Sequence, residues 1–168
     1  MRCFVAAFLA GESAERLQSR AGAVLGDLPS HRDVRRVPQQ NYHVTLTFLG
    51  EIGPDVLPEA LAAVDRLGGH PVAGRVVALT GFPRPSAARL LAAELEPEPQ
   101  LEGWWASLQG LAGAVERGFR PHVTVLRFRR PRTFRPSPLP VAVDLETPRL
   151  YRSDQTPDGV RYRPVTRG

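Results

Sequence analysis

The sequence predicts an α+β fold with a mixed, mostly antiparallel sheet, and three observations support this class. Segments with apolar residues at helical spacing alternate with shorter segments of strand-forming residues. Glycines and prolines, 15 and 17 in number, separate these segments where turns are expected. The order strand, helix, strand occurs twice, and each second strand contains the triplet His-Val-Thr. With 168 residues, we expect one domain, or two small lobes that share one cleft.

The first half of the chain is expected to contain three strands and two helices. The strands are predicted at 2–9, 34–37 and 42–49, and the helices at 13–25 and 55–67. We interpret residues 2–9 as a strand rather than a signal peptide, because the apolar run is short and a polar, helix-like segment follows at once. Gly26 is expected to end the first helix and Gly50 the third strand. Asp55 is a candidate cap for the second helix.

The second half is expected to contain six strands and one helix. The strands are predicted at 72–80, 88–95, 122–128, 141–145, 150–152 and 160–165, and the helix at 101–116. One face of that helix carries Leu101, Trp104, Leu108, Leu111 and Val115. We therefore interpret Trp104 and Trp105 as helix core rather than as a platform for stacking bases. The segment "RRPRTFRPSPLP" (129–140) is expected to form a proline-rich loop.

Composition excludes several classes of protein. Hydrophobic residues make up 42% of the chain and charged residues 23%, which favours a packed core over disorder. No stretch approaches the roughly 18–20 apolar residues that a membrane span needs. Cys3 is the one cysteine, so neither an internal disulfide nor a cysteine metal cluster can form. These features favour a cytoplasmic protein.

The positive charge of the chain favours an anionic partner. The net charge is +5, and all 22 basic residues are arginine, whose planar fork suits phosphate. A compositional bias of the genome would also explain arginine without lysine. The densest patch is "RFRRPRTFR" (127–135). It is either a solvated, proline-broken loop or a contact with an RNA backbone through Arg129, Arg130 and Arg132.

The two His-Val-Thr triplets place histidine and threonine on the same face of each strand, because side chains alternate along a strand. The first strand is expected to carry His43, Thr45 and Thr47 on one face and Val44, Leu46 and Phe48 on the other, in the core. The second strand is expected to carry His122 and Thr124 on one face and Val123 and Val125 on the other. Polar groups on an apolar strand are costly to bury without partners. Two lobes that face each other across a cleft would bring two imidazoles and two hydroxyls together.

This set of groups suits hydrolysis of a phosphate ester without a metal ion. One neutral imidazole can take a proton from water, and one protonated imidazole can give a proton to the leaving oxygen. Threonine hydroxyls can donate hydrogen bonds to the non-bridging oxygens. A zinc site is the alternative, but no Cys, Asp or Glu lies near the two histidines, and His31 and His70 fall in predicted loops. One His-x-Thr on a strand is common by chance, whereas two copies half a chain apart are not.

The chain resembles the two-histidine (2H) phosphoesterase superfamily, and within it the bacterial and archaeal RNA 2′,3′-cyclic phosphodiesterases, also called 2′-5′ RNA ligases. The two motifs of that family match "VPQQNYHVTLTFLGEI" and "FRPHVTVLRF". Flanking matches are "MRCFVAAFL" for the opening strand, "GFPRP" for a mid-chain turn and "PRLYRSDQTPDGVRYRPV" for the last two strands. The resemblance covers nearly the whole chain and implies a bilobal fold, with pseudo-symmetric lobes, helices outside and a central active-site cleft.

The resemblance also implies an activity and a role for each motif residue. The implied reaction hydrolyses RNA 2′,3′-cyclic phosphate to 2′-phosphate without a metal or other cofactor, with reversible 2′-5′ joining of RNA ends such as tRNA halves. His43 would be the general acid and His122 the general base. Thr45 and Thr124 would hold the phosphate, and Arg127 matches a substrate-binding arginine of the family. Strict alternation places Arg127 on the face opposite His122, so either the strand bends or the side chain reaches round.

We expect the protein to be a monomer. Two other functions are compatible with the sequence. One is a phosphodiesterase for small cyclic phosphates such as ADP-ribose cyclic phosphate. The other is an RNA-binding module that keeps the fold without turnover, which the presence of both histidines and both threonines disfavours. The arginines at 127–135 favour a polymeric substrate.

Overall fold

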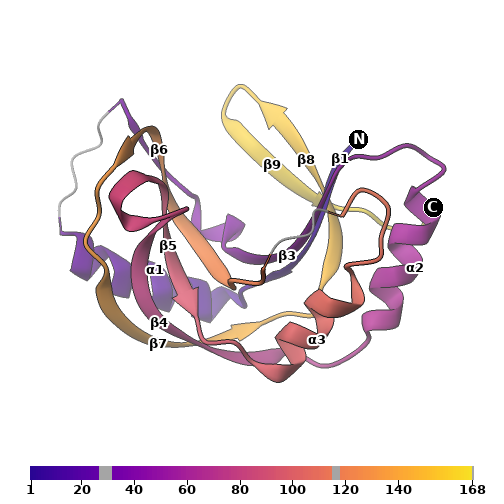
Figure 1. Cartoon of the computed structure of the whole chain (residues 1–168), viewed down its shortest axis with the longest axis horizontal. Helices are drawn as coiled ribbons and strands as arrows, with labels where there is room; N and C mark the ends of the chain where they lie inside the picture. Colours follow the sequence, from indigo (N-terminus) through magenta and orange to yellow (C-terminus); the bar gives the residue numbers. More distant parts are fainter. Residues whose placement is uncertain (27–31, 115–117, 168) are drawn as a thin grey trace.

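The computed structural model describes residues 1–26, 32–114 and 118–167, and its framework is one continuous sheet (Figure 1). The strands are β1 (Arg2–Phe8), β2 (Val34–Arg36), β3 (His43–Glu51), β4 (Val72–Phe82), β5 (Ala88–Leu95), β6 (His122–Arg132), β7 (Ser137–Leu145), β8 (Arg149–Thr156) and β9 (Gly159–Pro164). The helices are α1 (Gly11–Leu25), α2 (Leu57–Leu67) and α3 (Pro99–Ser107), with short 3₁₀ turns at Gln39–Asn41 and Pro85–Ala87. The strand order is β7-β4-β5-β6-β3-β1-β8-β9, and β2 pairs with β6 outside this order. The strand pairs are antiparallel, so the predicted α+β class is confirmed.

The sheet consists of two halves with the same arrangement. In one half, β1 and β3 pair and α1 connects them; in the other, β5 and β6 pair and α3 connects them. β8 and β9 extend the first half, and β4 and β7 extend the second. The halves meet where β3 lies beside β6. Among the described residues, these two strands are in register at one pair, Val44 and Val123.

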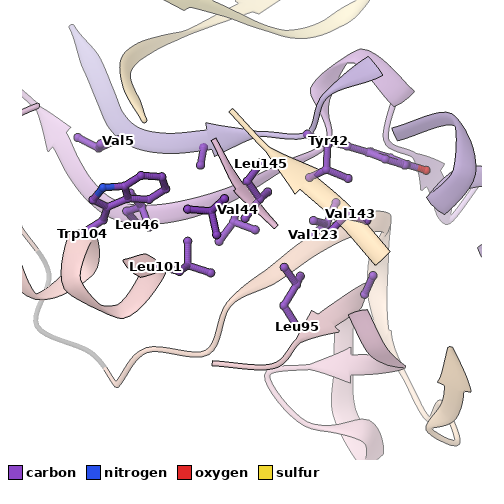
Figure 2. Packing of buried hydrophobic residues seen from close by; sticks show 14 of the residues in the cluster. Val5, Tyr42, Val44, Leu46, Leu95, Leu101, Trp104, Val123, Val143 and Leu145 are labelled. Carbon is purple, nitrogen blue, oxygen red and sulfur yellow. The ribbon is translucent and has the colours of Figure 1, made fainter. Parts of the chain in front are cut away.

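The main core covers the face of the sheet onto which the helices pack. α1 contacts β7, α2 contacts β8 and α3 contacts β3. Val44 and Val123 are fully buried in this core, and Figure 2 shows them among side chains from both halves, including Leu46 of β3 and Leu145 of β7. A smaller cluster on the other face consists of Phe4, Ala6 and Tyr151, with Phe8 and Tyr162 packed against it. The two faces therefore differ in what covers them.

The N-terminal segment forms β1, between β3 and β8, as predicted. Cys3 is buried and unpaired. None of the described helices is long and apolar enough to cross a membrane. His31, which was expected in a loop, lies outside the described residues.

All three helices differ from their predicted bounds, α1 only by beginning at Gly11 instead of residue 13. α2 begins at Leu57 with Val56 as its N-cap residue, and no side chain caps it, so the Asp55 cap was wrong. α3 ends at Ser107 instead of Glu116, and turns follow to Gly113, whose positive φ of 85° is incompatible with a continuing helix. Val115 and Glu116 lie outside the described residues. The apolar face of the prediction is otherwise present, with Leu101, Trp104, Leu108 and Leu111 buried.

The predicted proline-rich loop at 129–140 is largely strand. β6 continues to Arg132, and β7 begins at Ser137. β7 is an edge strand that pairs with β4, and its side chains alternate between buried and exposed. Pro138 and Pro140 both occupy exposed positions of this alternation, so edge geometry tolerates their missing N–H groups. Pro138 and Pro140 therefore mark a sheet edge, whereas Pro136 lies in the short connection between β6 and β7.

Candidate active site

The junction between the two halves brings four of the predicted site residues together. Because β3 and β6 are antiparallel, the Val44–Val123 pair places His43 alongside Thr124 and Thr45 alongside His122. The valines point into the main core, so the four polar side chains share the opposite face, which we call the histidine face. The triplets are neighbours in one sheet, whereas we had expected them on two lobes that face each other.

Each imidazole is held by the backbone two residues before it. His43 Nδ1 lies 2.7 Å from the Asn41 carbonyl oxygen, and His122 Nδ1 lies 2.7 Å from the Arg120 carbonyl oxygen. A carbonyl oxygen can only accept, so Nδ1 of each ring must carry the hydrogen. In the neutral ring, Nε2 is then the unprotonated atom. Both histidines are thereby fixed in the tautomer that leaves Nε2 free to take a proton.

His43 lies in an aromatic environment. Its ring stacks on Phe8 at 4.9 Å between centroids, is tilted against Phe4 at 5.3 Å and meets Tyr162 edge-on at 5.2 Å. Burial lowers the pKa of His43 from 6.5 to about 4, the hydrogen bond to Asn41 opposes this shift, and the positive charges of Arg127 and His122 add to it. In the free protein, His43 is therefore neutral at pH 7.

His122 has a more polar environment. Its ring stacks on Phe82 at 4.3 Å, and the Arg120 guanidinium lies 4.0 Å from the centroid of the same Phe82 ring. Arg120 Nε and Nη2 donate hydrogen bonds to Glu94, which pairs with His122 across β5 and β6. Burial lowers the pKa of His122, and the charge of Arg120 adds to this, whereas the hydrogen bond to the Arg120 carbonyl and the Glu94 carboxylate raise it.

A β-bulge in β3 changes the predicted faces after the first triplet. Thr45 and Thr47 pair with consecutive residues of β1, so Leu46 is an extra residue in the strand. Thr47 consequently turns toward the core, where its hydroxyl is buried without a hydrogen-bond partner among the described residues. Phe48 turns outward to the histidine face near Phe4, with 53% of its surface exposed. The predicted faces of Thr47 and Phe48 were therefore wrong.

A second bulge, at the equivalent position of β6, determines where Arg127 lies. Thr124 and Leu126 pair with consecutive residues of β5, so Val125 is the extra residue. Leu126 is buried in the main core, and Arg127 therefore shares the histidine face with His122 and Thr124. The strand thus bends, which was one of the two expected solutions. The charge of Arg127 lowers the pKa of both His43 and His122, so it acts on the two halves of the site.

The remaining predicted arginines lie at the far end of β6. Arg129 and Arg130 are exposed, whereas Arg132 is half-buried. The Arg132 guanidinium lies 5.7 Å from the ring of Phe128, which packs against the main core. Figure 1 shows this end of β6 and the β8–β9 hairpin projecting toward the same side of the molecule.

Sequence reasoning did not assign the residues around the histidines. Phe4 and Phe8 are four residues apart in β1, a spacing that predicts a shared face of the strand. No local pattern shows that β1 lies beside His43. Phe82, Arg120 and Glu94 come together through the pairing of β5 with β6, and carried no signal of their own.

The structure also shows a groove away from the histidine face and bears on whether a metal ion could be bound. A groove of about 490 Å³ lies between α2 and the bases of β8 and β9, and none of the predicted site residues lines it. Among the described residues, no group of three His, Cys, Asp or Glu side chains is arranged to hold a metal ion. The chemistry that the site itself offers is proton transfer by two imidazoles beside two hydroxyls and a guanidinium.

Comparison with known proteins gives consistent matches. The family described as LigT like phosphoesterase matches residues 12–91. An RNA 2′,3′-cyclic phosphodiesterase from Thermus thermophilus is 33% identical over 178 residues, which covers 96% of this chain and 86% of that protein. A protein of the same name from Archaeoglobus fulgidus is 25% identical over 127 residues, covering 73% of this chain and 72% of that protein.

Solved structures show the same fold. A protein from Thermus thermophilus superposes with a TM-score of 0.79 at 28% identity, covering 99% of this chain and 96% of that chain. Escherichia coli LigT in complex with 3′-AMP gives a TM-score of 0.75 at 23% identity, covering 98% of this chain and 95% of that chain.

The depressed pKa of His43 predicts that stability falls in mild acid. The unfolded chain takes up a proton near pH 6.5 and the folded chain only near pH 4, so the contribution of His43 is present above pH 6.5 and is lost as pH falls toward 4. Between pH 6.5 and 4, the wild type should lose up to about 3 kcal/mol more unfolding free energy than His43→Phe, which cannot be protonated. Urea unfolding of both proteins at a series of pH values measures this difference. Parallel pH profiles for the two proteins would contradict the buried, neutral imidazole.

Proposed function

The chain belongs to the LigT like phosphoesterase family, and we propose that it hydrolyses the 2′,3′-cyclic phosphate at the end of an RNA to a 2′-phosphate. The relative from Thermus thermophilus at 33% identity is named for a cyclic phosphodiesterase activity on RNA. The observation that carries the proposal is the pair of imidazoles, each fixed through Nδ1 by a backbone carbonyl and each on the histidine face beside a threonine of the other strand.

The reaction needs one proton removed and one proton supplied. Water attacks phosphorus, and the bond from phosphorus to the 3′ oxygen breaks. His122 Nε2 takes a proton from the attacking water, and protonated His43 gives the proton of its Nε2 to the departing 3′ oxygen. The product keeps the phosphate on the 2′ oxygen, and the proton count balances because one histidine gains what the other loses.

The other groups on the histidine face serve the phosphate. Thr45 and Thr124 donate hydrogen bonds to its non-bridging oxygens, where negative charge grows in the transition state. Arg127 supplies positive charge on the same face. A bound phosphate anion also raises the pKa of both imidazoles, which offsets the lowering caused by burial and lets one of them carry a proton near neutral pH. We propose that the reaction requires no metal ion.

The same arrangement supports two extensions of the activity. A 5′-hydroxyl of a second RNA in place of water would form a 2′-5′ linkage, by the same two proton transfers. RNA ends such as tRNA halves would contact Arg129, Arg130 and Arg132 through their backbone phosphates. We further infer that the protein acts in the cytoplasm as a monomer.

The charges around the two histidines bear on which of them is the general acid and which is the general base. The family resemblance makes His43 the acid and His122 the base. In the free protein, Glu94 raises the pKa of His122, whereas no carboxylate of the described residues acts on His43, and this difference favours the first proton on His122. The proposed assignment therefore requires the bound substrate to move the proton to His43.

Removal of either imidazole should abolish most of the activity. His43→Ala and His122→Ala should each lower kcat/KM on an RNA that ends in a 2′,3′-cyclic phosphate by at least ~10²-fold, because each removes a positioned acid or base. The double variant should lose much less than the product of the two single losses. His70→Ala, at an exposed position outside the site, is the matched control. Near wild-type turnover by either site variant would exclude the proposed pair.

A sulfur atom in place of the 3′ bridging oxygen should identify the acid. A thiolate leaves without a proton, so the variant that lacks the general acid should regain activity on this substrate. We expect His43→Ala to recover most of its ~10²-fold loss and His122→Ala to stay impaired, measured as the ratio of kcat for the sulfur and oxygen substrates. The opposite pattern would reverse the two roles.

The arginines at the end of β6 should make binding of oligonucleotides depend on salt. Each phosphate contact adds about −0.7 to the slope of log affinity against log salt for a single strand. Replacement of Arg129, Arg130 and Arg132 by Gln should flatten this slope for an oligonucleotide and change it little for a mononucleotide cyclic phosphate. Measurement of kcat/KM for both substrates across a salt series is the test. Equal slopes for both substrates in the wild type would instead favour small cyclic phosphates as substrates.

A further inference from the structure

Arg35 and Arg127 form a cross-strand pair on the histidine face. β2 pairs with β6 through Val34 with Phe128, Arg35 with Arg127 and Arg36 with Leu126. Residues directly opposite each other in an antiparallel pair point to the same side of the sheet. Since the bulge at Val125 turns Arg127 to the histidine face, Arg35 lies on that face as well.

Both members of this pair are exposed cations without a neutralising partner. Among the described residues, neither Arg35 nor Arg127 makes a hydrogen bond or an ion pair, whereas Arg120, Arg152 and Arg163 all pair with carboxylates. Like charges directly opposite each other on a sheet repel. An arrangement that keeps two guanidiniums together on the face used for catalysis is suited to an anion that neutralises both, and two planar forks match the oxygens of a phosphate.

The position of the pair indicates which phosphate it would bind. Because Val125 is bulged out, Arg127 is two ladder positions beyond Thr124, a separation of roughly 7 Å along the strand. That separation is comparable to the distance between successive phosphates of one RNA strand. The backbone of the pair is therefore displaced along the sheet from the two triplets, so that Arg35 lies where the next phosphate of the substrate would be and Arg127 lies between that phosphate and the reacting one.

We propose that Arg35 and Arg127 bind the phosphate on the 5′ carbon of the ribose whose 2′,3′-cyclic phosphate is cleaved. This inference rests on the proposed function and specifies which cyclic phosphates the protein should prefer as substrates. The protein should prefer a cyclic phosphate that belongs to a nucleotide with a 5′ phosphate, as in any RNA chain, over a simple nucleoside cyclic phosphate. Arg35 is a positioning residue for that phosphate and touches no reacting atom.

The test compares two substrates that differ by one phosphate. Adenosine 2′,3′-cyclic phosphate and its 5′-phosphorylated form are hydrolysed by the wild type, Arg35→Gln and Arg20→Gln, which removes an exposed charge of α1. The 5′ phosphate should lower KM by about tenfold or more in the wild type and in Arg20→Gln, as expected for a charge-assisted contact. Arg35→Gln should lose most of this gain while kcat on the 5′-phosphorylated substrate stays within a few-fold, and Arg35→Lys should keep part of it.

Direct binding separates failure of this inference from failure of the proposed function. Calorimetry with adenosine 2′-phosphate and adenosine 2′,5′-bisphosphate needs no turnover, and the second phosphate should tighten binding about tenfold in a manner that depends on Arg35. Turnover of both substrates without a gain from the 5′ phosphate, or a gain that Arg35→Gln retains, would overturn the second phosphate site and leave the hydrolase intact. Absence of turnover with an Arg35-dependent gain in binding would support the phosphate site and count against the hydrolase. A dinucleotide that ends in the cyclic phosphate, with a diester at the same carbon, shows whether an RNA chain provides the same gain.

Discussion

The pairing of Val44 with Val123 is the contact on which the rest of the site depends. It joins the two halves of the sheet, and it is centred on the middle residues of the two His-Val-Thr triplets. Antiparallel pairing about that centre sets the histidine of each strand beside the threonine of the other. Burial of both valines fixes which face the polar residues occupy. A slip of one residue in either strand would move its histidine to the core face and its valine to solvent, so the hydrophobic core enforces the register of the site.

Equivalent positions in the two halves carry different surroundings, and this asymmetry gives two similar imidazoles different properties. Rings from β1 and β9 surround His43, and no carboxylate of the described residues is among the groups that shift its pKa. A stacked phenylalanine and the Arg120–Glu94 ion pair surround His122. Acid and base catalysis at one phosphorus needs one imidazole with a proton and one without. Two identical environments would not determine which imidazole carries the proton. The pseudo-symmetric backbone therefore supplies the geometry, and the side chains around each ring supply the difference.

Much of this arrangement was predictable from local patterns, because strand alternation and glycine breaks are short-range properties. β5 was predicted with its exact bounds, β6 with its exact start, and β3 with a start one residue early. Prediction failed after Thr45, and left two positions open for Arg127 after Thr124, because a β-bulge follows each triplet and a bulge depends on pairing with a strand far away in the sequence. The same limit explains why Phe48 and Thr47 were assigned to the wrong faces. No local pattern identified Arg35 as a candidate site residue for the same reason, because its place beside the site depends on its pairing with Arg127 of β6.

In the proposed mechanism, the junction presents two imidazoles to one phosphorus, so that the bond from phosphorus to the 2′ oxygen is kept and the bond to the 3′ oxygen breaks. The most direct test is to incubate the wild-type protein with a short RNA that ends in a 2′,3′-cyclic phosphate, in excess chelator and in ¹⁸O-labelled water. The position of the product phosphate is then read by ³¹P NMR and its label by mass spectrometry. We predict a single product, a 2′-phosphate with one ¹⁸O atom, formed at the same rate with and without chelator. A 3′-phosphate product, or turnover that requires an added metal ion, would contradict this mechanism.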